Sequence, residues 1–150
     1  MIKRIPDSAY FGSSSCFLWG PRQTGKSTLL RALYPESPFY DLLDTRLFRR
    51  LSRDPGLFYE EISAMEFTET SPPVILDEVQ KLPELLDEVH RLIHGRGLSF
   101  LLCGSSARKL MRGGGNLLGG RALRKELLPL SYREIWKRFL DSLWDGVYSL

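Results

Sequence analysis

Short apolar runs alternate with segments of helical periodicity along most of the chain. The apolar runs are bounded by glycine, proline or polar residues and predict strands at residues 14–19, 38–41, 74–76, 98–103 and 122–128. Between them, amphipathic spacing predicts helices at about residues 27–34, 46–52, 56–65 and 82–95. This alternation predicts an α/β fold of three layers, with helices on both faces of a parallel sheet.

The segment at residues 82–95 has the clearest helical pattern. Its apolar residues recur every three or four positions, whereas charged residues fall on the opposite side. Pro83 suits the first turn, where its missing N–H is no loss, and the His94-Gly95 pair marks the end. A last helix is predicted after residue 131, with Ser131 as its cap and Glu134 as the capping partner.

The composition is that of one folded domain. Of the 150 residues, 43% are hydrophobic and 26% charged, close to the usage of soluble globular domains. No apolar run approaches the roughly 18 residues of a membrane-spanning helix, and residues 1–7 lack the apolar centre of a signal peptide. We therefore expect a cytoplasmic protein without membrane contact. The net charge of +3 is too small to indicate nucleic-acid binding by itself.

Cysteine and histidine, the usual ligands of transition metals, are few. Cys16 and Cys103 each lie inside an apolar run, and we expect both thiols to be buried and reduced. No Cys-x-x-Cys pair supports a zinc site. His90 and His94 are one helical turn apart, but Arg91 stands where the metalloprotease motif has glutamate, so we expect no metal site there.

The strongest chemical signal follows the first predicted strand. Eight residues, Gly-Pro-Arg-Gln-Thr-Gly-Lys-Ser, match the phosphate-loop pattern G-x-x-x-x-G-K-[ST] at every position. Glycines let the backbone turn its N–H groups inward at a helix N-terminus, which forms a nest for anions. Lys26 adds charge for the outer phosphates, and Ser27 offers a hydroxyl to magnesium. The residues expected to hold nucleotide are Gly20, Pro21, Arg22, Gln23, Thr24, Gly25, Lys26, Ser27 and Thr28.

Asp77 and Glu78 follow the third predicted strand. An apolar strand that ends in acids places carboxylates at the sheet edge where the loop lies. Alone, such a pair fits a solvated strand end equally well, but downstream of a matching phosphate loop it indicates a nucleotide site. We expect Asp77 to bind nucleotide through magnesium, together with Ser27, and Glu78 to polarise the attacking water.

Two serines, Ser105 and Ser106, follow the fourth predicted strand. Because ligands gather at the carboxyl ends of parallel strands, a hydroxyl here could contact the γ-phosphate or the attacking water. A helix cap is an equally good interpretation of Ser105, which precedes a predicted short helix. The sequence leaves both interpretations open, and one serine could serve both roles.

Five motifs occur in a fixed order along the chain. They are the phosphate loop, Leu-Asp-Glu-Val-Gln-Lys-Leu-Pro at 76–83, Gly-Ser-Ser-Ala at 104–107, Gly120-Arg121 and Pro-Leu-Ser-Tyr-Arg-Glu at 129–134. Together they resemble the ATPase domain of a bacterial and archaeal family of AAA-type ATPases, over about residues 17–135. The resemblance implies a P-loop NTPase fold with five parallel strands in the order 5-1-4-3-2. It also implies a catalytic Glu78 beside a magnesium-binding Asp77, and a polar sensor at Ser105 or Ser106.

Three features of that family have no counterpart in the sequence. These are its C-terminal domain of unknown function, the helical lid that many such ATPases close over adenine, and a Gly-Gly-aromatic-Pro stretch. We therefore divide the chain into a lead-in at 1–13, an AAA-type ATPase domain at 14–139 and a tail at 140–150, as expected of a truncated relative. The isolated chain is expected to bind ATP but to hydrolyse it slowly.

The sequence does not fix the arginine that would complete the site. ATPases of this type often use an arginine from a neighbouring subunit, which stabilises charge in the transition state. Arg108, Arg112 and Arg121 are candidates, and Arg121 matches the Gly-Arg pair of the family, although each also fits a solvated surface cation. The Gly-rich loop at 112–121 could contact DNA or a partner, but it equally suits a hairpin-like connection.

These patterns together predict a domain that binds Mg-ATP and hydrolyses it by attack of water on the γ-phosphate. ATP is preferred to GTP because no guanine-reading Asn-Lys-x-Asp stretch occurs. The alternative is a nucleotide-dependent binding module with little hydrolysis, and a nucleic-acid processing protein is a third class. A homo-oligomer, a protein partner and nucleic acid stay open as partners. The expected catalytic residues are Glu78, Lys26, Ser105 and Arg121.

Overall fold

The computed structural model describes Phe11 and residues 13–112, 118–120 and 122–127. Five strands form one sheet: β1 (Cys16–Trp19), β2 (Phe39–Asp41), β3 (Val74–Asp77), β4 (Phe100–Gly104) and β5 (Leu123–Glu126). Their order is β2-β3-β4-β1-β5, and every neighbouring pair is parallel. Read from the other edge, this is the predicted order 5-1-4-3-2, so the predicted fold is confirmed.

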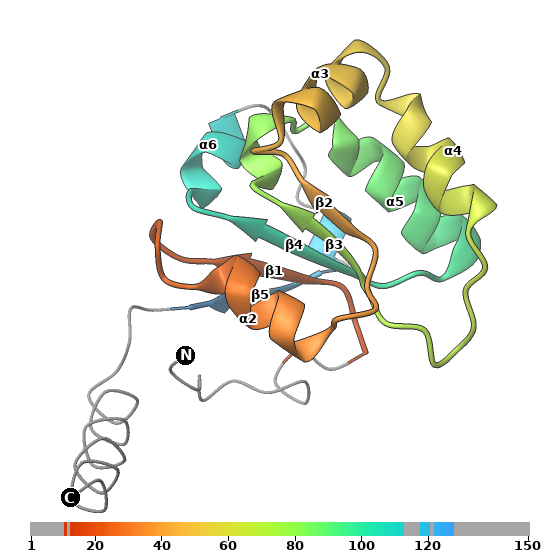
Figure 1. Cartoon of the computed structure of the whole chain (residues 1–150), viewed down its shortest axis with the longest axis horizontal. Coiled ribbons are helices and arrows are strands. Elements are labelled where there is room, and N and C mark those ends of the chain that lie inside the picture. Colours follow the sequence, from red (N-terminus) through yellow and green to blue (C-terminus); the bar gives the residue numbers. More distant parts are fainter. Residues whose placement is uncertain (1–10, 12, 113–117, 121, 128–150) are drawn as a thin grey trace, which may run out of the picture.

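Helices cover both faces of this sheet (Figure 1). They are α2 (Lys26–Leu33), α3 (Thr45–Arg53), α4 (Gly56–Ala64), α5 (Leu85–Arg96) and α6 (Ala107–Arg112), with short 3-10 helices η1 (Val79–Lys81) and η2 (Leu118–Gly120). Successive side chains of a strand point to opposite faces. Accordingly, Phe17 and Trp19 of β1 pack in one cluster with residues of α4 and α5, whereas Cys16 and Leu18 pack in another with residues of α2. The three predicted layers are therefore present.

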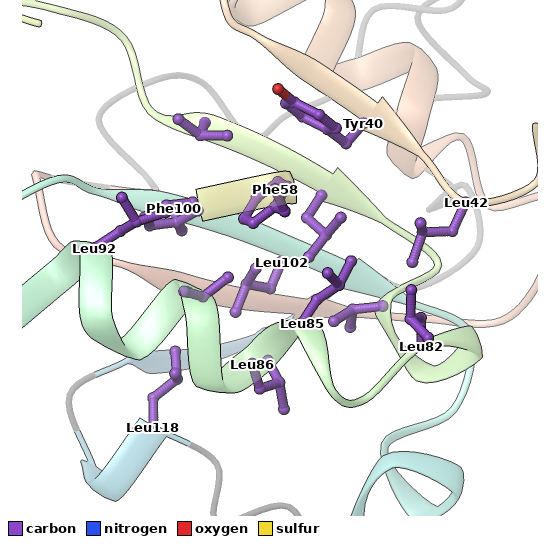
Figure 2. Packing of buried hydrophobic residues seen from close by; sticks show 14 of the residues in the cluster. Tyr40, Leu42, Phe58, Leu82, Leu85, Leu86, Leu92, Phe100, Leu102 and Leu118 are labelled. Carbon is purple, nitrogen blue, oxygen red and sulfur yellow. The ribbon is translucent and has the colours of Figure 1, made fainter. Parts of the chain in front are cut away.

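The larger core lies between the sheet and the helices α3, α4 and α5. Figure 2 shows Leu85 and Leu92 of α5 facing Phe100 and Leu102 of β4. The rings of Phe58 and Phe100 lie 6.3 Å apart between centroids. Burial of one such side chain stabilises a fold by about 1.5–3 kcal/mol. This core therefore fixes β3 and β4, and both strands end at the edge of the sheet where the acids lie.

The helix predicted at residues 82–95 is α5, but it begins and ends later than expected. Pro83 explains why Leu82 lies outside the helix, because the residue before a proline is disfavoured in helical conformation, and Leu82 has φ −143° and ψ 74°. The helix then begins two residues after the proline, at Leu85. Gly97, in the left-handed conformation at φ 64°, ends the helix in place of Gly95.

Cys16 and Cys103 lie on the neighbouring strands β1 and β4, buried and unbridged as predicted. Burial raises the pKa of Cys16 to about 11, although the positive charge of Lys125 opposes this shift. Burial also raises the pKa of Cys103 well above its usual value. Both thiols therefore belong to the core.

Several predictions concern residues outside the described part of the chain. These are most of the lead-in at 1–13, the loop at 113–117, Arg121, the helix capped by Ser131 and the tail at 140–150. The domain boundaries therefore stay predictions. Within the described ranges, no helix combines the length and apolar character needed to cross a membrane.

Candidate functional site

The loop at residues 20–27 joins β1 to α2 at the carboxyl edge of the sheet (Figure 1). A Cβ atom on Gly20 would lie 2.2 Å from the carbonyl oxygen of Leu127, so only glycine fits where the loop passes the end of β5. Gly25 precedes α2 at φ 80°, a left-handed conformation that glycine adopts without strain. Gln23 is also left-handed, at φ 62°. The loop thus turns tightly and delivers its last residues to the first turn of α2.

Lys26 is buried within this loop, with only 5% of its surface exposed. Its Nζ donates hydrogen bonds to the carbonyl oxygens of Gly20 at 2.6 Å and Pro21 at 2.8 Å, and to Thr24 Oγ1 at 3.4 Å. The hydroxyl of Thr24 donates in turn to the carbonyl of Pro21, at 2.9 Å. A buried ammonium group requires hydrogen-bond partners, and here neutral oxygens of the loop supply them.

A hydrogen bond joins the loop to the acidic end of β3. The Ser27 hydroxyl, in the first turn of α2, donates to Asp77 Oδ2, and the backbone N–H of Glu78 donates to Asp77 Oδ1 at 3.0 Å. Asp77 is only 2% exposed. Burial raises the pKa of Asp77, and the charges of Glu78 and Asp41 add to the rise, whereas the Ser27 bond opposes it. Asp77 is therefore a buried carboxylate whose charge is only partly compensated.

Glu78 lies directly after β3 in a left-handed conformation, at φ 57° and ψ 42°. Such a conformation is uncommon for a residue with a side chain, and it concentrates at functional sites. The Glu78 carboxylate accepts hydrogen bonds from Gln80 Nε2 and from the Ser105 hydroxyl, the latter at 3.3 Å. The end of β3 is thereby tied to the end of β4.

The two serines after β4 have different contacts. Ser105 donates to Glu78 and accepts a hydrogen bond from Gln80 Nε2 at 3.1 Å. Ser106 accepts a bond from the backbone N–H of Lys109 at 3.4 Å, as an N-terminal cap of α6 does. Ser106 rather than Ser105 therefore caps α6, and Ser105 contacts the acid, while its role toward the γ-phosphate stays a prediction.

Two cavities adjoin the loop. The first, of about 320 Å³, is lined by Arg22, Gln23, Gly25, Lys26, Ser27, Thr28, Leu43 and Glu78. It brings most of the predicted loop residues together with the predicted water-activating acid. The second, of about 700 Å³, is lined by Trp19, Gly20, Pro21, Ser105, Ser106, Ala107, Arg108, Arg124, Lys125 and Glu126.

The three candidate arginines are separated in the fold. Arg108 lines the second cavity, and Arg112 is exposed at the end of α6. Arg121, one of the predicted catalytic residues, lies outside the described residues. No arginine among the described residues lines the first cavity except Arg22 of the loop itself.

Sequence reasoning missed three residues at this edge of the sheet. Gln80 received no role, although it bonds both Glu78 and Ser105. Leu43, 56% exposed, lines the first cavity. Asp41 ends β2 opposite Asp77, and its charge raises the pKa of that neighbour. The signal available for Asp41 was its position at the end of a predicted strand.

Comparison with known proteins identifies a family whose sequences resemble this chain. The sequence profile described as "AAA domain" matches residues 13–136. Two uncharacterised proteins, from Mycobacterium tuberculosis and Mycobacterium bovis, are each 30% identical to the chain over 131 residues. The match covers 85% of this chain but only 28% of each relative, so the chain spans less than a third of their length.

Among solved structures, the Aeropyrum pernix ORC2 protein, determined in ADPNP–ADP complexes, superposes with a TM-score of 0.59. The superposition covers 85% of this chain and 45% of that protein. With 17% sequence identity, the likeness concerns the fold alone.

Proposed function

The chain belongs to the AAA domain family and has a P-loop NTPase fold, and we propose that it binds Mg-ATP and hydrolyses it by attack of water on the γ-phosphate. The observation that carries the proposal is the hydrogen bond between Ser27 and the buried Asp77. It places the loop hydroxyl and the strand-end carboxylate together, as a site for a phosphate-bound cation requires. Lys26, buried in the same loop, supplies the positive charge.

The loop offers several kinds of contact to phosphate. Its backbone turns at the left-handed Gln23 and Gly25 and leads into the N-terminus of α2, where N–H groups and the helix dipole favour anions. The ammonium group of Lys26 now bonds neutral carbonyl oxygens. Charged phosphate oxygens are stronger acceptors than carbonyls, so we expect Lys26 to exchange these partners when the triphosphate binds.

Ser27 and Asp77 fit a magnesium ion. A hydroxyl and a carboxylate in direct contact form a set of hard oxygen donors, which is what Mg²⁺ prefers. The burial of Asp77, with Glu78 and Asp41 nearby, leaves a negative charge that a cation would compensate. When bound, Mg²⁺ would neutralise charge on the phosphate oxygens.

Glu78 is the group we propose to accept a proton from the attacking water. Glu78 lines the same 320 Å³ cavity as Lys26, Ser27 and Thr28, so it lies beside the place proposed for the phosphates. Ser105 contacts its carboxylate and comes from the next strand of the sheet. In the proposed reaction, the water oxygen attacks the γ-phosphorus, Glu78 receives the proton, and ADP departs as the leaving group.

Two assays on the purified chain test the proposal. Mg-ATP should raise the melting temperature, since a ligand of the native state stabilises it, and phosphate should be released, measured with and without DNA. Lys26→Ala should abolish the thermal shift, whereas Lys109→Ala, an exposed lysine on α6, should retain it. Glu78→Gln should bind ATP and release no phosphate.

The outcomes separate the possible functions. A thermal shift without phosphate release would overturn hydrolysis and identify a nucleotide-dependent binding module. The absence of any shift, in wild type as in Lys26→Ala, would overturn nucleotide binding itself.

A further inference from the structure

We propose that Gln80 is a positioning residue that fixes the Glu78 carboxylate, so that one carboxylate oxygen is held and the other is presented to the attacking water. This inference rests on the proposed hydrolysis, because it gives Gln80 a role through the acid of that reaction. It assigns a function to the last residue of the Asp-Glu-Val-Gln run.

Three hydrogen bonds form a closed triangle around Glu78 Oε2. Gln80 Nε2 donates both to Glu78 Oε2 and to the Ser105 hydroxyl, and Ser105 donates to the same Oε2. The contacts are mutually compatible, because an amide nitrogen carries two protons and a hydroxyl can donate and accept at once. Glu78 Oε1 accepts no hydrogen bond from the described residues. Within the part of the chain that the structure describes, the carboxylate is therefore held by one oxygen only.

The backbone directs Gln80 back toward the acid. Glu78 is left-handed at φ 57°, and η1 follows it at once, so the side chain two residues later meets the carboxylate. The orientation of the amide is determined by its partner. An exchange of its nitrogen and oxygen would place two oxygens with lone pairs against each other.

The amide oxygen of Gln80, unlike its nitrogen, makes no hydrogen bond to Glu78. Its Oε1 is buried and has no hydrogen-bond partner within the described residues. It lies against Gly104, where a Cβ atom would come within 2.5 Å of it. A buried acceptor without a partner destabilises a fold. The placement of the amide is therefore explained by its nitrogen, which bonds Glu78 and Ser105.

A fixed carboxylate is a better base than a rotating one. Small misplacements of a reacting group reduce rates strongly, and loss of a residue that orients such a group typically reduces them on the order of 10- to 100-fold. Because Gln80 does not line the 320 Å³ cavity, its loss should leave nucleotide binding unchanged.

Gln80→Met tests this, because methionine keeps the length of the side chain and removes the amide. We expect kcat for ATP hydrolysis to fall roughly 10- to 100-fold, while KM and the thermal shift with Mg-ATP stay within about twofold. Lys81→Met is the matched control: it introduces the same side chain at the next, exposed position and should leave kcat unchanged.

Two results would overturn the inference while leaving the proposed function intact. One is a Gln80→Met variant with the kcat of the wild type. The other is a variant that loses nucleotide binding and thermal stability together with kcat, which would indicate a merely structural residue.

A second measurement does not depend on turnover. The NMR signals of the Gln80 side-chain amide, identified by their loss in Gln80→Met, should move in a Glu78→Ala variant and stay in place in Lys81→Met. Unmoved signals in Glu78→Ala would refute the contact whatever the enzyme does. If the wild type releases no phosphate, the proposed function fails and the role of Gln80 in it fails too, even where the signals report the contact.

Discussion

Replacement of Ser27 by alanine removes one hydrogen bond at the centre of the candidate site. The hydroxyl donates to Asp77 Oδ2, and the carboxylate is 2% exposed, so water cannot readily replace the lost donor. The backbone N–H of Glu78, 3.0 Å from Oδ1, remains as a partner. The perturbation therefore weakens the compensation of a buried charge without abolishing it.

The expected magnitude follows from two opposing terms. A hydrogen bond to a charged group stabilises a fold by about 1.5–3 kcal/mol. Alanine is a better helix former than serine in the first turn of α2, and this offsets roughly 0.5 kcal/mol of the lost stability. We therefore expect Ser27→Ala to lower the free energy of unfolding by about 1–2.5 kcal/mol. Urea unfolding in EDTA, without nucleotide, measures this change. Ser52→Ala, an exposed serine of α3, is the matched control and should change it by less than about 0.5 kcal/mol.

A double-mutant cycle separates this bond from other effects of the substitution. In an Asp77→Asn background the partner is uncharged, so Ser27→Ala should lose most of its cost. The coupling energy should be about 1–2 kcal/mol. Equal costs in both backgrounds would refute the reasoning, because the loop and the acidic strand would then not interact through these side chains.

Three further predictions concern the buried groups. Burial raises the pKa of Asp77 above 3.8, so its carboxylate destabilises the fold as it ionises. Asp77→Asn should therefore gain stability relative to the wild type as pH rises from about 4 to 8. In urea titrations, a difference in unfolding free energy between variant and wild type that stays constant with pH would contradict this. Gly20→Ala should lower the free energy of unfolding by about 1–3 kcal/mol, because its Cβ would clash with the carbonyl of Leu127 after β5. Gly95→Ala, with no atom near its Cβ, should raise it by about 0.5–1 kcal/mol in thermal or urea unfolding. Similar effects of the two substitutions would argue against that clash. The buried thiols of Cys16 and Cys103 should react with a chromogenic disulfide reagent far more slowly in the native protein than in urea, and rapid native labelling would contradict their place in the core.

The phosphate loop could be identified from sequence because its requirements are largely local. Gly25 needs a left-handed conformation directly before α2, and Lys26 and Ser27 follow at fixed spacing. The constraint on Gly20 is different in kind. It comes from the carbonyl of Leu127, which the fold brings from far along the chain, and no local pattern reveals it.

The position of the two acids at the end of β3 could be predicted from the sequence, but their contacts could not. Asp77 and Glu78 stand at the end of an apolar run, which is a visible signal. The hydrogen bond between Gln80 and Glu78 depends on the left-handed conformation of Glu78, and no pattern in the sequence predicts that conformation. Ser105 and its neighbour could not be distinguished for a similar reason, because the turn into α6 decides which hydroxyl faces the acid.

The order of the strands could not be predicted from the hydrophobic pattern alone. Alternation of strands and helices predicts a parallel sheet but is compatible with several orders, and 5-1-4-3-2 came from the family resemblance. The start of α5 is the opposite case. Pro83 restricts the residue before it, so the exclusion of Leu82 from the helix can be predicted from the sequence.

The position of β1 between β4 and β5 has a consequence for how the chain folds. Its neighbours β4 and β5 both come from distant parts of the sequence, and Ser15, just before it, accepts a hydrogen bond from the N–H of Phe100, 85 residues away. Closing such long loops costs entropy before the contacts compensate it, so strands of this kind pair late. During synthesis, β1 leaves the ribosome well before either partner exists, and the loop at Gly20 can settle against Leu127 only after β5 has emerged. Ribosome-bound chains arrested before residue 123 should therefore be cleaved readily by protease at this loop, and resistance there would show that it takes shape earlier.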